Sequence, residues 1–193
     1  VNLGVEGMMA LAALTAFAAA QAYGPLPGVL AAFGVGALSG LFLGLFAVTL
    51  RANQFVAGLA VAALGLGASG LLGKRYEGLP LAHPLPEGGF ALLGAALALL
   101  VHLFLTRTRT GLFLRSAGEN PKAVDLFGVS VDGVRYLALG LGGGLIGLAG
   151  AYLSLAYRPS WTDGMTAGLG WVAIALVILA AWHPLRALLG AYF

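Results

Sequence analysis

Apolar residues run along most of the chain in long stretches without a formal charge. Five such stretches, at 7–50, 52–73, 88–106, 136–157 and 164–185, contain no Asp, Glu, Lys or Arg. A helix needs roughly 20 apolar residues to cross about 30 Å of hydrocarbon. The first stretch is interrupted at Tyr23-Gly24-Pro25-Leu26-Pro27 and therefore predicts two helices. The apolar runs are continuous rather than alternating, which favours helices over a transmembrane barrel.

The pattern predicts an all-α integral membrane protein, a polytopic bundle of about six transmembrane helices. The expected spans are 3–21, 28–49, 55–73, 89–105, 136–157 and 166–182. Composition agrees, because only 9% of the residues are charged, against about 25% in soluble domains. The chain begins inside apolar sequence and stops as a new apolar segment begins. We therefore expect residues 1–193 to form one transmembrane domain, as a fragment of a longer protein.

Positive charge is distributed unequally between the two faces of the predicted bundle. The connections at 50–54, 106–135 and 183–189 fall on one face and hold seven of the ten Lys and Arg residues. Lys and Arg are enriched in cytoplasmic loops. This face and the N-terminus are therefore predicted to be cytoplasmic, in a multi-pass protein of the inner (plasma) membrane.

Several functional classes are disfavoured by composition and motifs. The chain has no cysteine, hence no disulfide and no thiolate metal site. The net charge of +3 sits at helix ends, which argues against extended nucleic-acid binding. Zinc-protease and serine-hydrolase motifs are missing, and residues 68–75 depart from a phosphate-binding loop at Ala68 and Arg75. We expect no enzymatic activity, no ATPase site, no metal and no cofactor.

Small residues recur at helical spacing in two of the predicted spans. Gly36, Gly40 and Gly44 repeat every four residues, and so do the pairs Gly140 with Gly144 and Gly143 with Gly147. Such stripes let helices approach closely in lipid. They indicate tight packing, faces that slide during transport, or both.

Residues 106–135 form the one polar segment long enough to hold structure of its own. Within it, 120–128 predicts a short helix, with Asn120 as cap, Pro121 at the first position and Gly128 as a left-handed stop. Ala123, Leu126 and Phe127 would share its apolar edge. So short a helix is unstable alone, so it must dock on its own bundle or on a partner.

The sequence from Arg115 to Ala123, followed by Gly128-Val129, resembles the cytoplasmic signature of ABC-transporter permeases for branched-chain amino acids, simple sugars and nucleosides. Segments 2–9, 51–60 and 157–175 resemble the nucleoside and simple-sugar branch. The resemblance implies a coupling helix, between the fourth and fifth spans, that docks on an ATP-hydrolysing subunit. The implied coupling residues are Gly118, Glu119, Asn120, Pro121, Lys122, Ala123, Asp125 and Gly128.

The resemblance also implies partners and a substrate class. The partners are an ABC ATP-binding subunit, a second permease subunit (identical or related) and an extracytoplasmic substrate-binding protein that meets 74–88 and 156–167. The expected substrate is a nucleoside, with a simple sugar as the second candidate and a branched-chain amino acid as the third.

The alternative function is a gradient-driven secondary transporter or channel for a small polar solute. That class places ionisable groups within the membrane, and the predicted spans contain only Glu6 and His102.

Polar and aromatic residues at membrane depth are candidates for the substrate path: Asn2, Glu6, Asn53, Gln54 and Trp171. Each has a structural alternative. Asn53 can cap the helix that it precedes, and Trp171 can anchor the membrane interface. Glu6 can be solvated, pair with an arginine or face the path.

Overall fold

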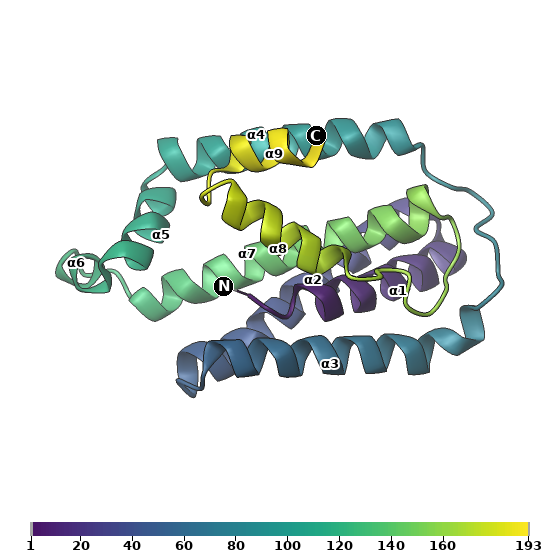
Figure 1. Cartoon of the computed structure of the whole chain (residues 1–193), viewed down its shortest axis with the longest axis horizontal. Helices are drawn as coiled ribbons and strands as arrows, with labels where there is room; N and C mark the ends of the chain where they lie inside the picture. The colour runs from purple at the N-terminus through teal and green to yellow at the C-terminus, as the bar shows by residue number, and fades with distance from the viewer. Residues whose placement is uncertain (1, 193) are drawn as a thin grey trace.

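The computed structural model describes residues 2–192, and the regular elements within that range are helical apart from two isolated β-bridges (Figure 1). The helices are α1 (Val5–Tyr23), α2 (Pro25–Gly44), α3 (Gln54–Gly73), α4 (Glu87–Arg107), α5 (Arg109–Glu119), α6 (Pro121–Leu126), α7 (Val131–Tyr152), α8 (Leu169–Leu179) and α9 (Pro184–Tyr192). Two π-helical turns, Leu45–Thr49 and Leu153–Tyr157, extend α2 and α7, and a 3₁₀ turn, Lys74–Tyr76, extends α3.

Five helices in the described range are long and apolar enough to cross a membrane. They are Val5–Tyr23, Pro25–Thr49, Gln54–Tyr76, Glu87–Arg107 and Val131–Tyr157, and they match the first five predicted spans. This confirms an all-α membrane protein with several spans.

The sixth predicted span, 166–182, is a helix of about half the expected length. α8 has 11 residues, which at 1.5 Å per residue is roughly 16 Å. Left-handed backbone angles precede it at Ala167 and Gly168 and follow it at Ala181 and Trp182, and these interrupt helical hydrogen bonding at both ends. Residues 183–189, predicted as a connection, belong mostly to α9 instead.

α1 lies at the centre of the bundle and packs against α2, α3 and α7. Its interior positions are small: Ala12, Ala13 and Ala16 are fully buried, together with Phe17. Short side chains let three neighbouring helices approach the same helix. The hydroxyl of Ser154 in the turn after α7 donates a hydrogen bond to the Ala13 carbonyl oxygen, at 2.8 Å.

The glycine stripes of α2 and α7 lie where these two helices cross. A Cβ atom at Gly36 would overlap the Gly143 carbonyl oxygen, and one at Gly147 would overlap that of Ala32. The two backbones are therefore in direct contact, as the packing interpretation of the stripes predicts.

α4 stands apart from this central group, with α9 alongside it (Figure 1). α5 and α6 lie together at one end of the molecule, beyond the ends of α4 and α7. We call this the α6 end. The long connection between α3 and α4 lies at the opposite end.

Candidate functional site

The short helix predicted from the polar segment exists as α6, and it is seated on its own chain. Val124 is 1% exposed and packs in a cluster with Ala117 of α5 and with Val131 and Val134 of α7. A six-residue helix has too few internal hydrogen bonds to persist alone, so this apolar contact holds it in place. α5, which fills most of the segment before it, was not predicted.

Two details of the expected turn differ in the structure. Gly118 and Glu119 belong to the last turn of α5, so Asn120 alone separates the two helices. Asn120 is extended, as expected for a residue before proline. Its side chain makes no capping hydrogen bond, in contrast to the prediction; the N–H of Ala123 bonds the backbone carbonyl oxygen of Asn120 instead, at 3.1 Å. Gly128 has φ of +72°, which confirms the left-handed stop.

The outer side of α6 is apolar and exposed. Leu126 is 88% exposed and Phe127 is 77% exposed. These two members of the expected apolar edge are therefore not covered by the chain itself. Lys122, Asp125 and Glu119 are exposed around them, and Ala123 is half-buried. We call Leu126, Phe127 and these three charged residues the α6 surface. It combines a small apolar centre with a charged rim, an arrangement typical of protein interfaces.

Glu6 makes a contact that its predicted alternatives did not describe, and the alternative that it faces the substrate path stays a prediction. Glu6 is 4% exposed, and its carboxylate accepts two backbone hydrogen bonds at the start of α8, from Gly168 N–H at 2.9 Å and Gly170 N–H at 2.7 Å. The interpretations of Glu6 as solvated or paired with arginine are therefore wrong. The free N–H groups and the dipole at a helix N-terminus stabilise a carboxylate, which explains how a charge is tolerated there.

This contact lies near the middle of the bundle along the membrane direction. Gly7 packs directly on α3 at Ala62 and Gly65. In the span Gln54–Tyr76, those positions lie roughly 12 to 17 Å from the start of a helix about 34 Å long. Glu6 and the first turn of α8 are therefore at mid-depth.

The segment before α8 descends to that depth along α3. Trp161 lies against Gly73 at the end of α3, and the carboxylate of Asp163 lies beside Gly70, one turn deeper. Irregular backbone at membrane depth is tolerated only where protein buries it or water reaches it. α8 is thus a half-helix that begins inside the bundle.

The remaining substrate-path candidates divide between two regions. Asn2 lines a cavity of about 240 Å³ with residues of α7 and α8, and Trp171 lies in the first turn of α8, so both are near Glu6. Asn53 caps α3 by accepting the N–H groups of Phe55 and Val56, which confirms its structural alternative. Gln54 lines a cavity of about 420 Å³ at the α6 end, together with Arg135. The five residues do not form one site.

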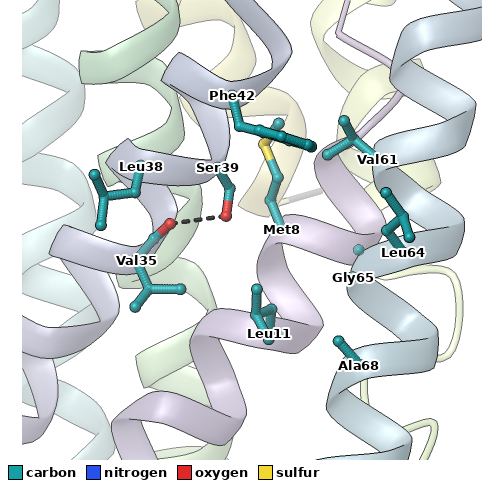
Figure 2. Close-up of a pocket in the computed structure, with 11 residues that line it drawn as sticks. Met8, Leu11, Val35, Leu38, Ser39, Phe42, Val61, Leu64, Gly65 and Ala68 are labelled. Carbon is teal, nitrogen blue, oxygen red and sulfur yellow. Dashed lines mark hydrogen bonds between the residues drawn. The ribbon is translucent and has the colours of Figure 1, made fainter.

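A third cavity, of about 460 Å³, lies between α1, α2 and α3 (Figure 2). Its lining is apolar except for Ser39, whose hydroxyl donates to the Val35 carbonyl oxygen of its own helix at 2.8 Å. Met8 and Phe42 close one end in this view. A polar solute would lose its hydrogen bonds to water here and gain few in return, so this cavity is not a substrate-site candidate.

At the end opposite α6, two connections lie side by side. Isolated β-bridges join Glu77 to Trp161 and Pro80 to Ser160, and Leu81 N–H donates to the Pro159 carbonyl oxygen at 3.0 Å. Segments 74–88 and 156–167, which were expected to meet a binding protein, are therefore joined by backbone contacts at 77–81 and 159–161.

Sequence reasoning missed Gly168 and Gly170, the partners of Glu6. The signal that could have found them was the Gly-Leu-Gly sequence at 168–170 inside an apolar run. A glycine there accommodates the left-handed φ of +86° at position 168, and at 170 it lets Glu6 approach the backbone.

Comparison with known proteins gives consistent matches. The chain matches a family described as branched-chain amino acid transport system / permease component over residues 1–193. A putative glucose ABC transporter permease, TsgC13 of Haloferax volcanii, is 39% identical over 99% of this chain and 65% of its own length. The guanosine ABC transporter permease NupQ of Bacillus subtilis is 30% identical over 100% of this chain and 70% of its own.

A third relative, the nucleoside ABC transporter permease NupC of Lactococcus lactis, is 30% identical over 99% of this chain and 70% of its own length. The chain therefore spans only 65% to 70% of these curated relatives. No solved structure matches it significantly.

Proposed function

Because the chain belongs to the branched-chain amino acid transport system permease family, we propose that it forms part of the membrane-spanning subunit of an ATP-driven importer. Its substrate is a nucleoside or a simple sugar, and a separate ATP-binding subunit hydrolyses ATP. The protein sits in the plasma membrane with the α6 end in the cytoplasm.

The observation that carries this proposal is the α6 surface. Leu126 and Phe127 are large, apolar and exposed, on a short helix that Val124 anchors rigidly to α5 and α7. At the end of a membrane bundle, beyond the apolar spans, exposed apolar side chains are stabilised by a protein partner. A helix that is fixed to the bundle transmits a push from that partner to α5 and α7.

The orientation follows from charge. Arg107, Arg109, Arg115 and Lys122 are exposed at the α6 end, and Lys and Arg are enriched in cytoplasmic loops. An ATP-binding subunit would meet the α6 surface from that side. A substrate-binding protein would meet the joined segments 74–88 and 156–167 at the opposite end, and a second permease subunit would complete the translocation path.

The substrate class rests on the relatives, whose names specify glucose, guanosine and nucleosides. Both classes are neutral polyols with several hydrogen-bonding groups. They require polar wall groups rather than a fixed charge, and Asn2 and Gln54 are polar residues that line two separate cavities.

The test uses the full-length permease, co-expressed with its ATP-binding and substrate-binding subunits. We would replace Leu126 and Phe127 together by serine and measure co-purification of the ATP-binding subunit and uptake of radiolabelled guanosine and glucose. Both side chains are exposed, so membrane insertion should be unchanged. Association and uptake should both be lost.

The matched control is Leu92→Ser, a change at a position of comparable exposure on α4, away from the α6 surface. It should leave association with the ATP-binding subunit intact. If the double variant still bound that subunit and supported ATP-driven uptake, the α6 surface would not be the coupling site. Wild-type uptake that depended on an ion gradient and not on ATP would favour the secondary-transporter alternative.

A further inference from the structure

α8 is a half-helix whose closest contact with the bundle is at its first turn, beside Glu6. Gly170 is its one buried residue, and a Cβ atom there would lie 2.8 Å from the backbone Cα of Glu6. Val172, Ile178 and Leu179 are exposed. The first turn makes the closest contact, at the point where Glu6 also bonds it; farther along, Ile174 and Val177 line a cavity with Asn2 and Val5, and α8 contacts α9.

Both ends of α8 are places where the backbone changes direction. Ala167 and Gly168 precede it with positive φ, and Ala181 and Trp182 follow it with positive φ. Hinges are short non-helical positions that absorb changes in φ and ψ. α8 is thus a short rod between two hinges, and its first turn is the part that Glu6 holds.

The bonds of Glu6 determine whether that turn is released. An ionised carboxylate is an acceptor with two oxygens, and here one oxygen takes the N–H of Gly168 and the other that of Gly170. Hydrogen bonds to a charged group are stronger than those between neutral groups. The carboxylate also holds α1, the most buried helix of the bundle, to the start of α8.

We propose that Glu6 is a positioning residue that holds α8 against α1 at mid-membrane, and that α8 is a hinged half-helix gate of the translocation path. The gate role rests on the proposed transport function, whereas the holding role does not. In the closed state of the gate, Glu6 accepts hydrogen bonds from the N–H groups of Gly168 and Gly170. Opening swings the cytoplasmic half of α8 away from Asn2 and Val5, which line a cavity with it.

The test is Glu6→Gln in the full-length permease with its ATP-binding subunit. Glutamine keeps the size of the side chain but replaces one acceptor oxygen by an NH₂ donor, which faces one of the two N–H groups. Spin labels at cysteines introduced at Val172 and Leu59 would report the distance from α8 to α3; residues 1–193 contain no native cysteine, and any cysteine elsewhere in the full-length permease would be replaced. The distance distribution should broaden, and uptake should fall at least about tenfold, the factor expected for one charge-assisted hydrogen bond.

Glu87→Gln is the matched control, because Glu87 is an exposed acidic residue in the first turn of α4. It should change neither the distance nor the uptake. An unchanged distribution in Glu6→Gln would overturn the holding role. A broadened distribution with normal uptake would overturn the gate role. If the wild-type protein took up neither guanosine nor glucose with ATP, the proposed function would fail, while the distance measurement would still decide whether Glu6 holds α8.

A second variant keeps Glu6 intact. Val5→Cys with Ile174→Cys places two thiols on the same cavity, and a short, reducible bifunctional thiol reagent would tie α8 to α1. Uptake should stop on cross-linking and return on reduction, whereas each single-cysteine variant should be unaffected by the reagent. Continued uptake with α8 tied to α1 would overturn the gate role.

Discussion

Replacing Gly143 by alanine tests the direct contact between α2 and α7. A Cβ atom at this position would overlap the Gly36 carbonyl oxygen and lie 3.1 Å from both the Gly36 carbonyl carbon and the Cα of Gly40. These neighbours are backbone atoms, which cannot turn aside as a flexible side chain would. Relief therefore requires the two helices to separate.

The expected loss of unfolding free energy is estimated from that separation and by comparison with a control variant on the same helix. A gap of about 0.5–1 Å forfeits a quarter to a half of the dispersion energy of each contact, and overpacking in a close-packed interior costs about 1–3 kcal/mol. Gly142→Ala is the control, because nothing lies within 4 Å of its Cβ position. Both changes gain the same helix propensity of about 1 kcal/mol. The difference between the two variants should therefore be about 1–3 kcal/mol.

The assay is the free energy of unfolding of the two variants, by steric trapping in bicelles or by denaturant titration in a mild detergent. Gly142→Ala should equal or exceed the stability of the wild type, and Gly143→Ala should fall below Gly142→Ala. If the two alanine variants unfolded with the same free energy, the backbone contact of α2 and α7 would contribute nothing specific, and the tight-packing argument would be wrong.

Three further changes are predicted from single contacts. Asn53→Ala should lower the free energy of unfolding by about 1 kcal/mol, because its side chain caps α3. Ser154→Ala should lower it by about 1 kcal/mol, because its hydroxyl bonds the Ala13 carbonyl oxygen across two helices, whereas Ser39→Ala, which loses a bond within its own helix, should have a smaller effect. Gly128→Ala should weaken ATP-binding-subunit association, because a φ of +72° costs a non-glycine residue about 1–2 kcal/mol and shifts the end of α6. If Ser154→Ala and Ser39→Ala had the same free energy of unfolding, the bond between Ser154 and Ala13 would contribute nothing specific. If Gly128→Ala still bound the ATP-binding subunit as the wild type does, the left-handed end of α6 would not matter for association.

The membrane spans were predictable because one physical requirement sets them. A charge-free apolar run of sufficient length is stable as a helix in lipid whatever its neighbours, and the run 52–73 became α3 almost residue for residue. The stop of α6 was equally local, since Gly128 supplies a conformation that few other residues adopt. Local chemistry of this kind is visible in sequence.

The parts that were missed depend on contacts with neighbouring helices or on the backbone angles of single residues. Val124 of α6 packs against Ala117 of α5 and Val134 of α7. Leu126 and Phe127 therefore face outward. The sequence of 120–128 shows that the helix has apolar residues but not which of them its own bundle covers. The shortness of α8 was missed because hydropathy averages over a window and does not register the left-handed positions at its two ends.

Glu6 bears directly on what drives transport. A carboxylate in the middle of a membrane protein is ordinarily a reason to suspect a proton or ion relay. Here the N–H groups of Gly168 and Gly170, at the end of a helix dipole, already bond both carboxylate oxygens. Both oxygens are therefore engaged in holding the start of α8. A carboxylate held in this way is better suited to fixing the position of a helix that another energy source moves, which agrees with a partner that acts through α6.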